Sequence, residues 1–171
     1  DGKRGTIWVV DEFSGDFGAI NEKGELLGKF DLFFEVVGLA LDASDGSVWV
    51  GDNGEHVLAR FDNEGSRQTR IDSLPKLGAL AFHASLEELW ALTSKGDQLL
   101  RVGKALQLTR VNLPPTFTGP VVDMAIAENT GEAWIATRNR VVRINKEGSV
   151  VFTAPEEFRF ASRVALDQAS G

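Results

Sequence analysis

Short runs of hydrophobic residues, separated by polar turn residues, recur along the chain and predict β-strands. Val, Ile, Leu and Phe gather in these runs, and turn formers separate them. Short apolar runs bounded by turn signals are typical of strands rather than helices. The turns include Asp45-Gly46, Glu64-Gly65, Thr130-Gly131 and Glu147-Gly148. We therefore expect an all-β chain without a helix.

The strand pattern repeats, and one tryptophan marks each repeat. The tryptophans are Trp8, Trp49, Trp90 and Trp134, separated by 41, 41 and 44 residues. A second apolar run lies ten residues before each later tryptophan, at Leu39, Leu80 and Met124. Four short strands in a repeat of about 41–45 residues are typical of a propeller blade. The sequence therefore predicts a four-bladed β-propeller with four strands in each blade.

The two ends of the chain extend this prediction. The first repeat has no apolar run upstream of Trp8, but residues 163–167 match residues 38–42. A C-terminal strand that completes the first blade would close the ring and leave no unpaired sheet edges at its ends. The predicted blades are residues 1–36 with 161–171, then 37–76, 77–119 and 120–160.

The alternative is a four-blade fragment of a larger propeller, because chain boundaries often fall in equivalent turns. The chain begins at Asp1 rather than Met and has no apolar segment like a signal peptide. We therefore expect a processed product or an excised piece.

Residues 37–52 and 57–65 resemble an NHL-type repeat. That family alternates an apolar inner strand ending in Asp, an Asp-Gly turn, an aromatic strand ending in Asp, and a third strand before a charged turn with Gly. The resemblance covers nearly the whole chain and is weakest in the third repeat, where Thr93 replaces the strand-end Asp. It implies a propeller whose relatives include binding platforms, lyases, lactonases and sensor domains.

The tryptophans belong to the predicted core. Each should lie on the second strand of a blade, where neighbouring sheets face each other. A large ring at that position fills the wedge between blades. We therefore assign none of them to a binding site.

Composition narrows the possible functions. The chain has 171 residues, a net charge of −7, no cysteine and two histidines. Its acidity argues against nucleic acid and anionic membranes as partners, and no apolar run could span a bilayer. Thiolate chemistry and a three-histidine metal site are excluded within this chain. No phosphate-binding loop, dinucleotide fingerprint or Gly-x-Ser-x-Gly motif occurs.

The loops between the second and third strands carry most of the candidate binding residues. In propellers these loops gather on one face around the central channel, where ligands usually bind. The candidates are Asp11, Glu12, Asp16, Asp52, Asn53, Glu55, His56, Arg138 and Arg140. The alternative is that Asp and Asn beside Gly serve as turn formers that accept hydrogen bonds from their own backbone.

The surplus of negative charge lies in the first third of the chain. Residues 1–52 hold 4 basic and 11 acidic side chains, and the remainder holds 14 of each. This sector would steer a cationic ligand or a basic partner, or serve as a solvated face that aids solubility. Loops between blades also carry aromatics that either pack over blade edges or form an apolar lip for a partner: Phe33, Phe34, Phe117, Phe158 and Phe160, beside Pro114 and Pro115.

Two further sets of residues are candidates for a site. Asp123 and Arg163 lie at the mouths of inner strands, and in a closed ring we expect them to pair across the channel or to bind a small polar ligand. The second set is a possible Ca²⁺ site formed by clustered oxygens, although its spacing is not that of an EF-hand. Its members are Asp11, Asp16, Asp52 and Glu55.

We predict a non-catalytic binding or protein-interaction platform that uses the loop face and needs no cofactor. Its partner would be a protein or a small polar ligand. The alternatives are a metal-assisted propeller lyase or hydrolase, and part of a larger propeller enzyme. The compartment stays open, with a secreted or periplasmic bacterial location as one option.

Overall fold

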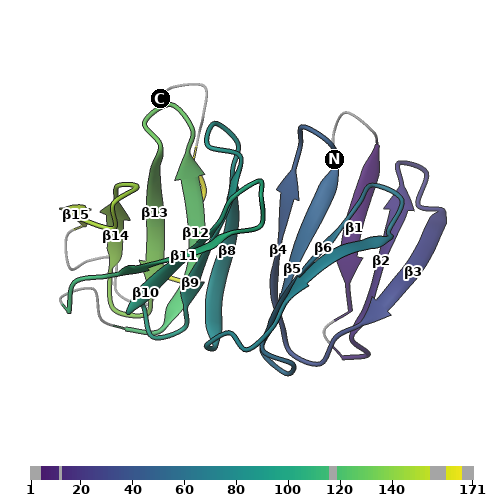
Figure 1. Ribbon diagram of the computed structural model, residues 1–171, viewed down its shortest axis with the longest axis horizontal. Helices are drawn as coiled ribbons and strands as arrows, with labels where there is room; N and C mark the ends of the chain where they lie inside the picture. Colours follow the sequence, from purple (N-terminus) through teal and green to yellow (C-terminus); the bar gives the residue numbers. More distant parts are fainter. Residues whose placement is uncertain (1–4, 12, 116–118, 155–160, 167–171) are drawn as a thin grey trace. The chain divides into compact units, whose positions relative to one another are not determined.

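Figure 1 shows the computed structural model of the chain, which describes residues 5–11, 13–115, 119–154 and 161–166. Every regular element within these ranges is a β-strand, as the short apolar runs between turns predict. No helix that could cross a membrane is found in this part of the chain. The strands form four antiparallel sheets, and each strand pairs with its neighbours in sequence.

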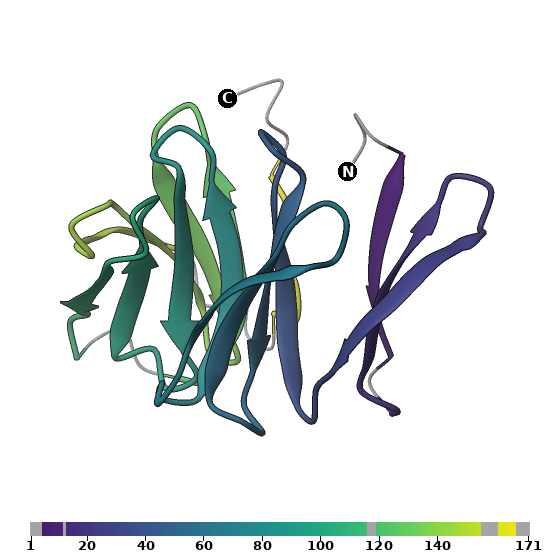
Figure 2. The same ribbon diagram turned by 45° about the vertical axis from the view of Figure 1, so that its right-hand side comes forward.

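The first two sheets belong to one compact unit, Asp1–Pro75, called unit 1 here. The first sheet consists of β1 (Thr6–Val10), β2 (Asp16–Asn21) and β3 (Leu26–Leu32). It is drawn in purple in Figures 1 and 2. The second sheet consists of β4 (Val36–Asp42), β5 (Ser47–Asp52), β6 (Val57–Phe61) and β7 (Arg67–Ile71).

The other two sheets belong to a second compact unit, Lys76–Gly171, called unit 2. The third sheet consists of β8 (Leu77–His83), β9 (Glu88–Thr93), β10 (Gln98–Val102) and β11 (Leu108–Asn112). The fourth consists of β12 (Val121–Ala127), β13 (Glu132–Thr137), β14 (Val141–Ile144) and β15 (Val150–Thr153).

The strand register puts three of the tryptophans in the same cross-strand row. Each has an alanine opposite it on the inner strand and an arginine on the third strand. The rows are Ala40–Trp49–Arg60, Ala81–Trp90–Arg101 and Ala125–Trp134–Arg143. The guanidinium carbons lie 6.0, 5.5 and 5.3 Å from the ring centroids, within the range of a cation–π contact.

Each of these arginines also pairs with a carboxylate at the start of the tryptophan strand or in the turn before it. Arg60 reaches Asp45 at 2.8 Å, Arg101 reaches Glu88 at 2.7 Å, and Arg143 reaches Glu132 at 3.2 Å. The carboxylate holds the guanidinium over the indole. The second, third and fourth sheets therefore each contain a Trp–Arg–carboxylate set, of which only the tryptophan was predicted from the sequence.

The core of unit 1 lies between its two sheets. Phe17 stacks on Trp8 at 5.4 Å between ring centroids and contacts Phe61 of the second sheet at 4.7 Å. Val48 and Val50 of β5 complete this cluster. The placement of Trp8 between two sheets agrees with its predicted role in the core.

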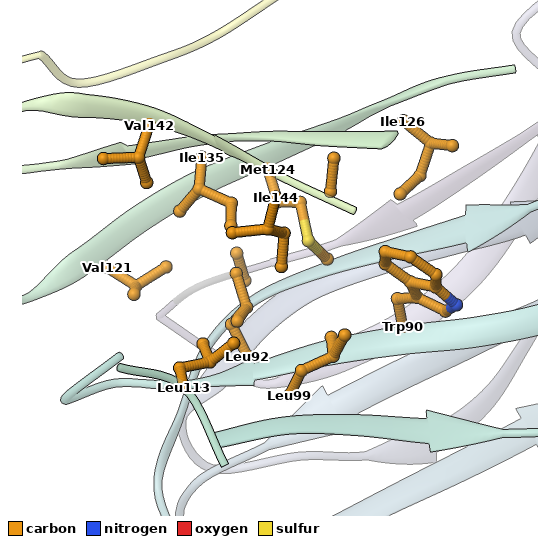
Figure 3. Packing of buried hydrophobic residues seen from close by; sticks show 12 residues of the cluster. Trp90, Leu92, Leu99, Leu113, Val121, Met124, Ile126, Ile135, Val142 and Ile144 are labelled. Carbon is orange, nitrogen blue, oxygen red and sulfur yellow. The ribbon is translucent and has the colours of Figure 1, made fainter. Parts of the chain in front are cut away.

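The core of unit 2 is built in the same way from its own two sheets. Trp90, Leu92 and Leu99 of the third sheet pack against side chains of the fourth sheet (Figure 3). The facing residues are Met124, Ile126, Ala133, Ile135, Val142 and Ile144. One sheet thus presents its tryptophan, and the next presents smaller apolar side chains.

The first sheet differs from the predicted blade because it has three strands instead of four. Residues 161–166 form no strand, and residues 167–171 lie outside the described ranges. The backbone N–H of Val164 instead donates to Oδ2 of Asp123, at 2.9 Å, at the inner strand of the fourth sheet. No fourth strand of the first blade is therefore seen among the described residues, and the blade boundaries stay a prediction.

Candidate functional site

Three loops of unit 1 come together through backbone hydrogen bonds. They join β1 to β2, β3 to β4 and β5 to β6. The N–H of Phe33 donates to the carbonyl of Gly15 at 2.9 Å, and the N–H of Asn53 donates to the carbonyl of Glu35 at 2.8 Å. We call the described residues of these loops, 11, 13–15, 33–35 and 53–56, the loop face of unit 1. The predicted gathering of these loops is therefore present within unit 1.

The equivalent loops of unit 2 are joined in the same way. The N–H of Leu113 donates to the carbonyl of Asp97 at 2.9 Å, and that of Arg138 donates to the carbonyl of Pro120 at 3.0 Å. Arg138 is exposed and Arg140 is half-buried in the β13–β14 loop. These two predicted site residues thus belong to unit 2, whereas the acidic candidates belong to unit 1.

A short oxygen side chain stands three residues after each tryptophan and caps the turn that follows. Asp11 Oδ1 accepts the N–H groups of Phe13 and Ser14 at 2.8 and 3.0 Å. In unit 2, Thr93 Oγ1 accepts the N–H of Gln98 at 3.1 Å, and Thr137 Oγ1 accepts that of Arg140 at 3.1 Å. A threonine hydroxyl therefore replaces the carboxylate without loss of the cap, which supports the turn-former interpretation.

Asp52 caps its own turn and also ties two loops together. Its side chain is completely buried. Oδ1 accepts the N–H of Glu35 at 2.6 Å, and Oδ2 accepts the N–H of Glu55 at 3.0 Å. A buried carboxylate needs such donors, because an uncompensated charge in the interior is very costly. Both carboxylate oxygens of Asp52 thus stabilise the conformation of the loop face.

The remaining acidic candidates of unit 1 make ion pairs. Asp16 pairs with Lys29, and this hydrogen bond is the main reason why the pKa of Asp16 lies below its ordinary value. Glu55 pairs with Arg70 at 2.7 Å. Asp72 and then Glu55 raise the pKa of Arg70. These carboxylates are partly exposed and already have cationic partners.

Two further candidates have local partners, and one cannot be placed. Nδ1 of His56 lies 3.1 Å from the carbonyl of Leu74, and His56 has a φ of 58°. Asn53 is nearly buried and bonds through its backbone to Glu35. Glu12 lies outside the described residues.

The predicted cation site is not formed by the residues that the structure describes. Within these ranges, no group of three or more His, Cys, Asp or Glu side chains is placed to hold a metal ion. Asp11, Asp16, Asp52 and Glu55 instead satisfy N–H groups or cationic side chains, as set out above. The physical reason is that each carboxylate bonds to its own turn or to a neighbouring strand.

The channel candidates also interact differently from the expectation. Asp123 accepts the N–H of Met124 and that of Val164, both at 2.9 Å. Arg163 donates to the carbonyl of Ser162 at 2.7 Å. Among the described residues no ion pair joins Asp123 to Arg163.

Two aromatic side chains stand out from the loop face of unit 1. Phe13 is fully exposed in the β1–β2 loop, and Phe34 is 76% exposed in the β3–β4 loop. Phe33, by contrast, is buried against Phe17 and Phe61. A Cβ at Gly54 would stand 2.6 Å from the Cβ of Phe34, so glycine is needed there for the close approach of the two loops. Phe34 was among the loop aromatics predicted from the sequence, whereas Phe13 was not.

Comparisons with known proteins establish the fold. No family model matches the chain, and no curated protein matches it. Among solved structures, virginiamycin B lyase from Staphylococcus aureus has a TM-score of 0.71 at 17% identity, covering 86% of this chain and 51% of that chain. The Swd1 β-propeller domain of Myceliophteria thermophila has a TM-score of 0.79 at 11% identity, covering 98% of this chain and 56% of that chain. The chain has a β-propeller fold.

These likenesses bear on the fold and not on the activity. The chain spans about half the length of the solved propellers that it matches. This coverage is consistent with the alternative of a fragment of a larger propeller. The NHL resemblance stays a prediction, because no family model supports it.

The hydrogen bonds that Asp11 accepts in its turn predict the pH at which its side chain titrates. The N–H groups of Ser14 and then Phe13 hold the pKa of the Asp11 carboxyl below its ordinary value. A lowered pKa contributes stability that is present above the pKa of the unfolded chain and lost as pH falls through the folded pKa. We expect side-chain NMR to show Asp11 titrating at lower pH than the same residue in a peptide of residues 9–16. Equal pKa values in the protein and the peptide would contradict the cap.

Proposed function

We propose that the chain is a β-propeller scaffold that binds a protein partner through the loop face of unit 1. The exposure of Phe13 and Phe34 on that face carries the proposal. Aromatic side chains are enriched in protein interfaces and often supply much of the binding energy. Burial of two exposed phenylalanines by a partner would remove apolar area from water and so favour binding.

Charge defines the partner further. Asp11, Glu35 and Glu55 are exposed on the same loop face. The first 52 residues carry 11 acidic and 4 basic side chains. Such a surface favours a partner segment with Lys or Arg beside large apolar side chains, because complementary charge speeds encounter and selects partners.

The loop face is preorganised for binding. Asp11 caps the β1–β2 loop, and Asp52 ties the β5–β6 loop to the β3–β4 loop. Loops fixed before binding lose little conformational entropy when the partner arrives, which improves affinity. The carboxylates predicted as ligand contacts therefore support the site mainly by shaping it.

A peptide-display selection on the purified chain tests this function. We expect enriched peptides to combine Lys or Arg with large apolar residues. Phe13→Ala and Phe34→Ala should each weaken a selected peptide by about tenfold or more, as interface hot spots do.

The matched control is Leu86→Ala, which removes an exposed apolar side chain from the β8–β9 loop of unit 2. Its affinity for the peptides should equal that of the wild type. The proposal fails if no peptide is enriched, or if both phenylalanine variants bind the selected peptides as tightly as the control does.

A further inference from the structure

The loop faces of the two units differ in charge, although their loops are joined in the same way. On the loop face of unit 1, the Asp, Glu, Lys and Arg side chains of the described residues are all acidic. We call the corresponding described residues of unit 2, 94–97, 113–115, 119–120 and 138–140, the loop face of unit 2. Cationic residues outnumber acidic ones there, since Lys95, Arg138 and Arg140 stand against Asp97.

The caps of the turns explain part of this difference. In unit 1, carboxylates of Asp11 and Asp52 accept the backbone N–H groups of their turns. In unit 2, the hydroxyl groups of Thr93 and Thr137 accept the equivalent N–H groups. A hydroxyl supplies the acceptor without adding a negative charge. The turns of unit 2 therefore lack two carboxylates that would partly neutralise the cations beside them.

The cationic side chains start from backbone segments that are hydrogen-bonded to one another. The N–H of Val121 donates to the carbonyl of Ser94, the residue before Lys95, at 3.0 Å. The N–H of Arg138 donates to the carbonyl of Pro120, also at 3.0 Å. Residues 120 and 121 thus join the β9–β10 loop to the β13–β14 loop, and this arrangement lies entirely within unit 2.

These cations also lack the ion pairs that other cations of unit 2 have. The arginines beside the tryptophans pair with carboxylates. Within the described ranges, Lys95, Arg138 and Arg140 form no ion pair. The carboxylate of Asp97 instead accepts the hydroxyl of Thr93, at 2.5 Å. Like charges gathered on one face repel one another, and a bound anion would relieve that repulsion.

We propose that the loop face of unit 2 binds an acidic segment of a partner protein, one with several Asp or Glu side chains. A guanidinium group donates two parallel hydrogen bonds to a carboxylate, which suits Arg138 and Arg140 to this contact. Lys95 and Arg138 are exposed on loops, where an extended segment can reach them. The net charge of −7 favours a short acidic segment over nucleic acid, because the rest of the chain repels a long polyanion.

Fluorescence anisotropy with a labelled hexaglutamate peptide at low ionic strength tests this contact. We expect saturable binding that weakens as NaCl is added, because salt screens exposed charges. Arg138→Glu and Arg140→Glu should each weaken binding by about tenfold. The matched control is Arg110→Glu, which makes the same change of charge at an exposed position of β11 and should bind nearly as tightly as the wild type.

A second pair of variants tests the neutral caps. Thr137→Asp gives the fourth sheet the capping carboxylate that the second sheet has at Asp52, and Thr137→Asn places a neutral side chain of the same shape there. The aspartate variant should bind the peptide more weakly than the asparagine variant. Cooperative circular dichroism melts well above the assay temperature would show that the variants are folded.

Three outcomes overturn the proposal. The first is a wild-type chain that does not bind the peptide at low ionic strength. The second is an equal loss of affinity in Arg138→Glu, Arg140→Glu and the Arg110→Glu control, since this indicates a response to net charge alone. The third is a hexathymidine DNA strand that binds more tightly than the peptide and loses its binding in Arg138→Glu, since the face then prefers nucleic acid.

Discussion

Replacing Trp90 by alanine is expected to lower the free energy of unfolding by about 3–5 kcal/mol. The side chain is fully buried in the core of unit 2 and packs near Met124 and Ile126. Its Nε1 donates to Glu88 at 3.1 Å, and Arg101 lies over its ring. The substitution leaves a large cavity and removes the ring from beneath the arginine. Urea unfolding followed by circular dichroism measures the loss.

Trp134→Ala is the matched control for this prediction. It removes the same side chain from the same strand position, but Trp134 is half-buried and its neighbour Phe152 is exposed. We therefore expect a clearly smaller loss of stability. Equal losses would mean that the sheet-to-sheet packing around Trp90 adds nothing to its cost.

Asp52→Ala is expected to lower the free energy of unfolding by about 2–4 kcal/mol, because N–H groups that lose a buried acceptor keep their desolvation cost. The carboxylate accepts from Glu35 and Glu55 and is fully buried. Thermal and urea unfolding measure the loss, and amide hydrogen exchange at Glu35 and Glu55 locates it. We expect faster exchange at both positions.

Two variants separate charge from shape at this site. Asp52→Asn keeps one acceptor oxygen but turns a second N–H donor toward the loop, so its loss should lie between that of alanine and zero. Asp11→Ala removes the equivalent cap at an exposed position and should cost less than Asp52→Ala. If Asp52→Ala left both stability and hydrogen exchange unchanged, the conclusion that Asp52 holds the β5–β6 loop to the β3–β4 loop would be wrong.

The fold was largely predictable because the tryptophans, which are the largest side chains, recur at a nearly constant spacing along the sequence. The tryptophan spacing and the Gly-containing turns indicated strands, sheets and turns that the structure contains. The arginines of the repeat escaped notice for a simple reason. Arg60 and Arg101 follow their tryptophans by 11 residues, but Arg143 follows by 9, because the intervening loop is shorter. In the paired strands all three arginines nevertheless lie opposite their tryptophans, which their spacing along the sequence does not show.

The candidate site was predictable in outline only. Sequence position placed Asp11 and Asp52 in turns of the same kind, and the structure brings their loops together. It did not reveal that Asp52 is buried and occupied by N–H groups, nor that Phe33 turns inward while Phe34 turns outward. These outcomes depend on which partners the folded chain brings near each side chain, and residue type does not encode them.

The strictly sequential pairing of strands has a consequence for how such a chain forms and changes. Every described strand pairs only with the strand before or after it. Hairpins of this kind close short loops, so their entropic cost of closure is small and pairing can begin at several points along the chain. An added or deleted sheet breaks no pairing in the others. Gene duplication can therefore lengthen the array by whole sheets, and a copy of the second, third or fourth sheet inherits its Trp–Arg–carboxylate set intact.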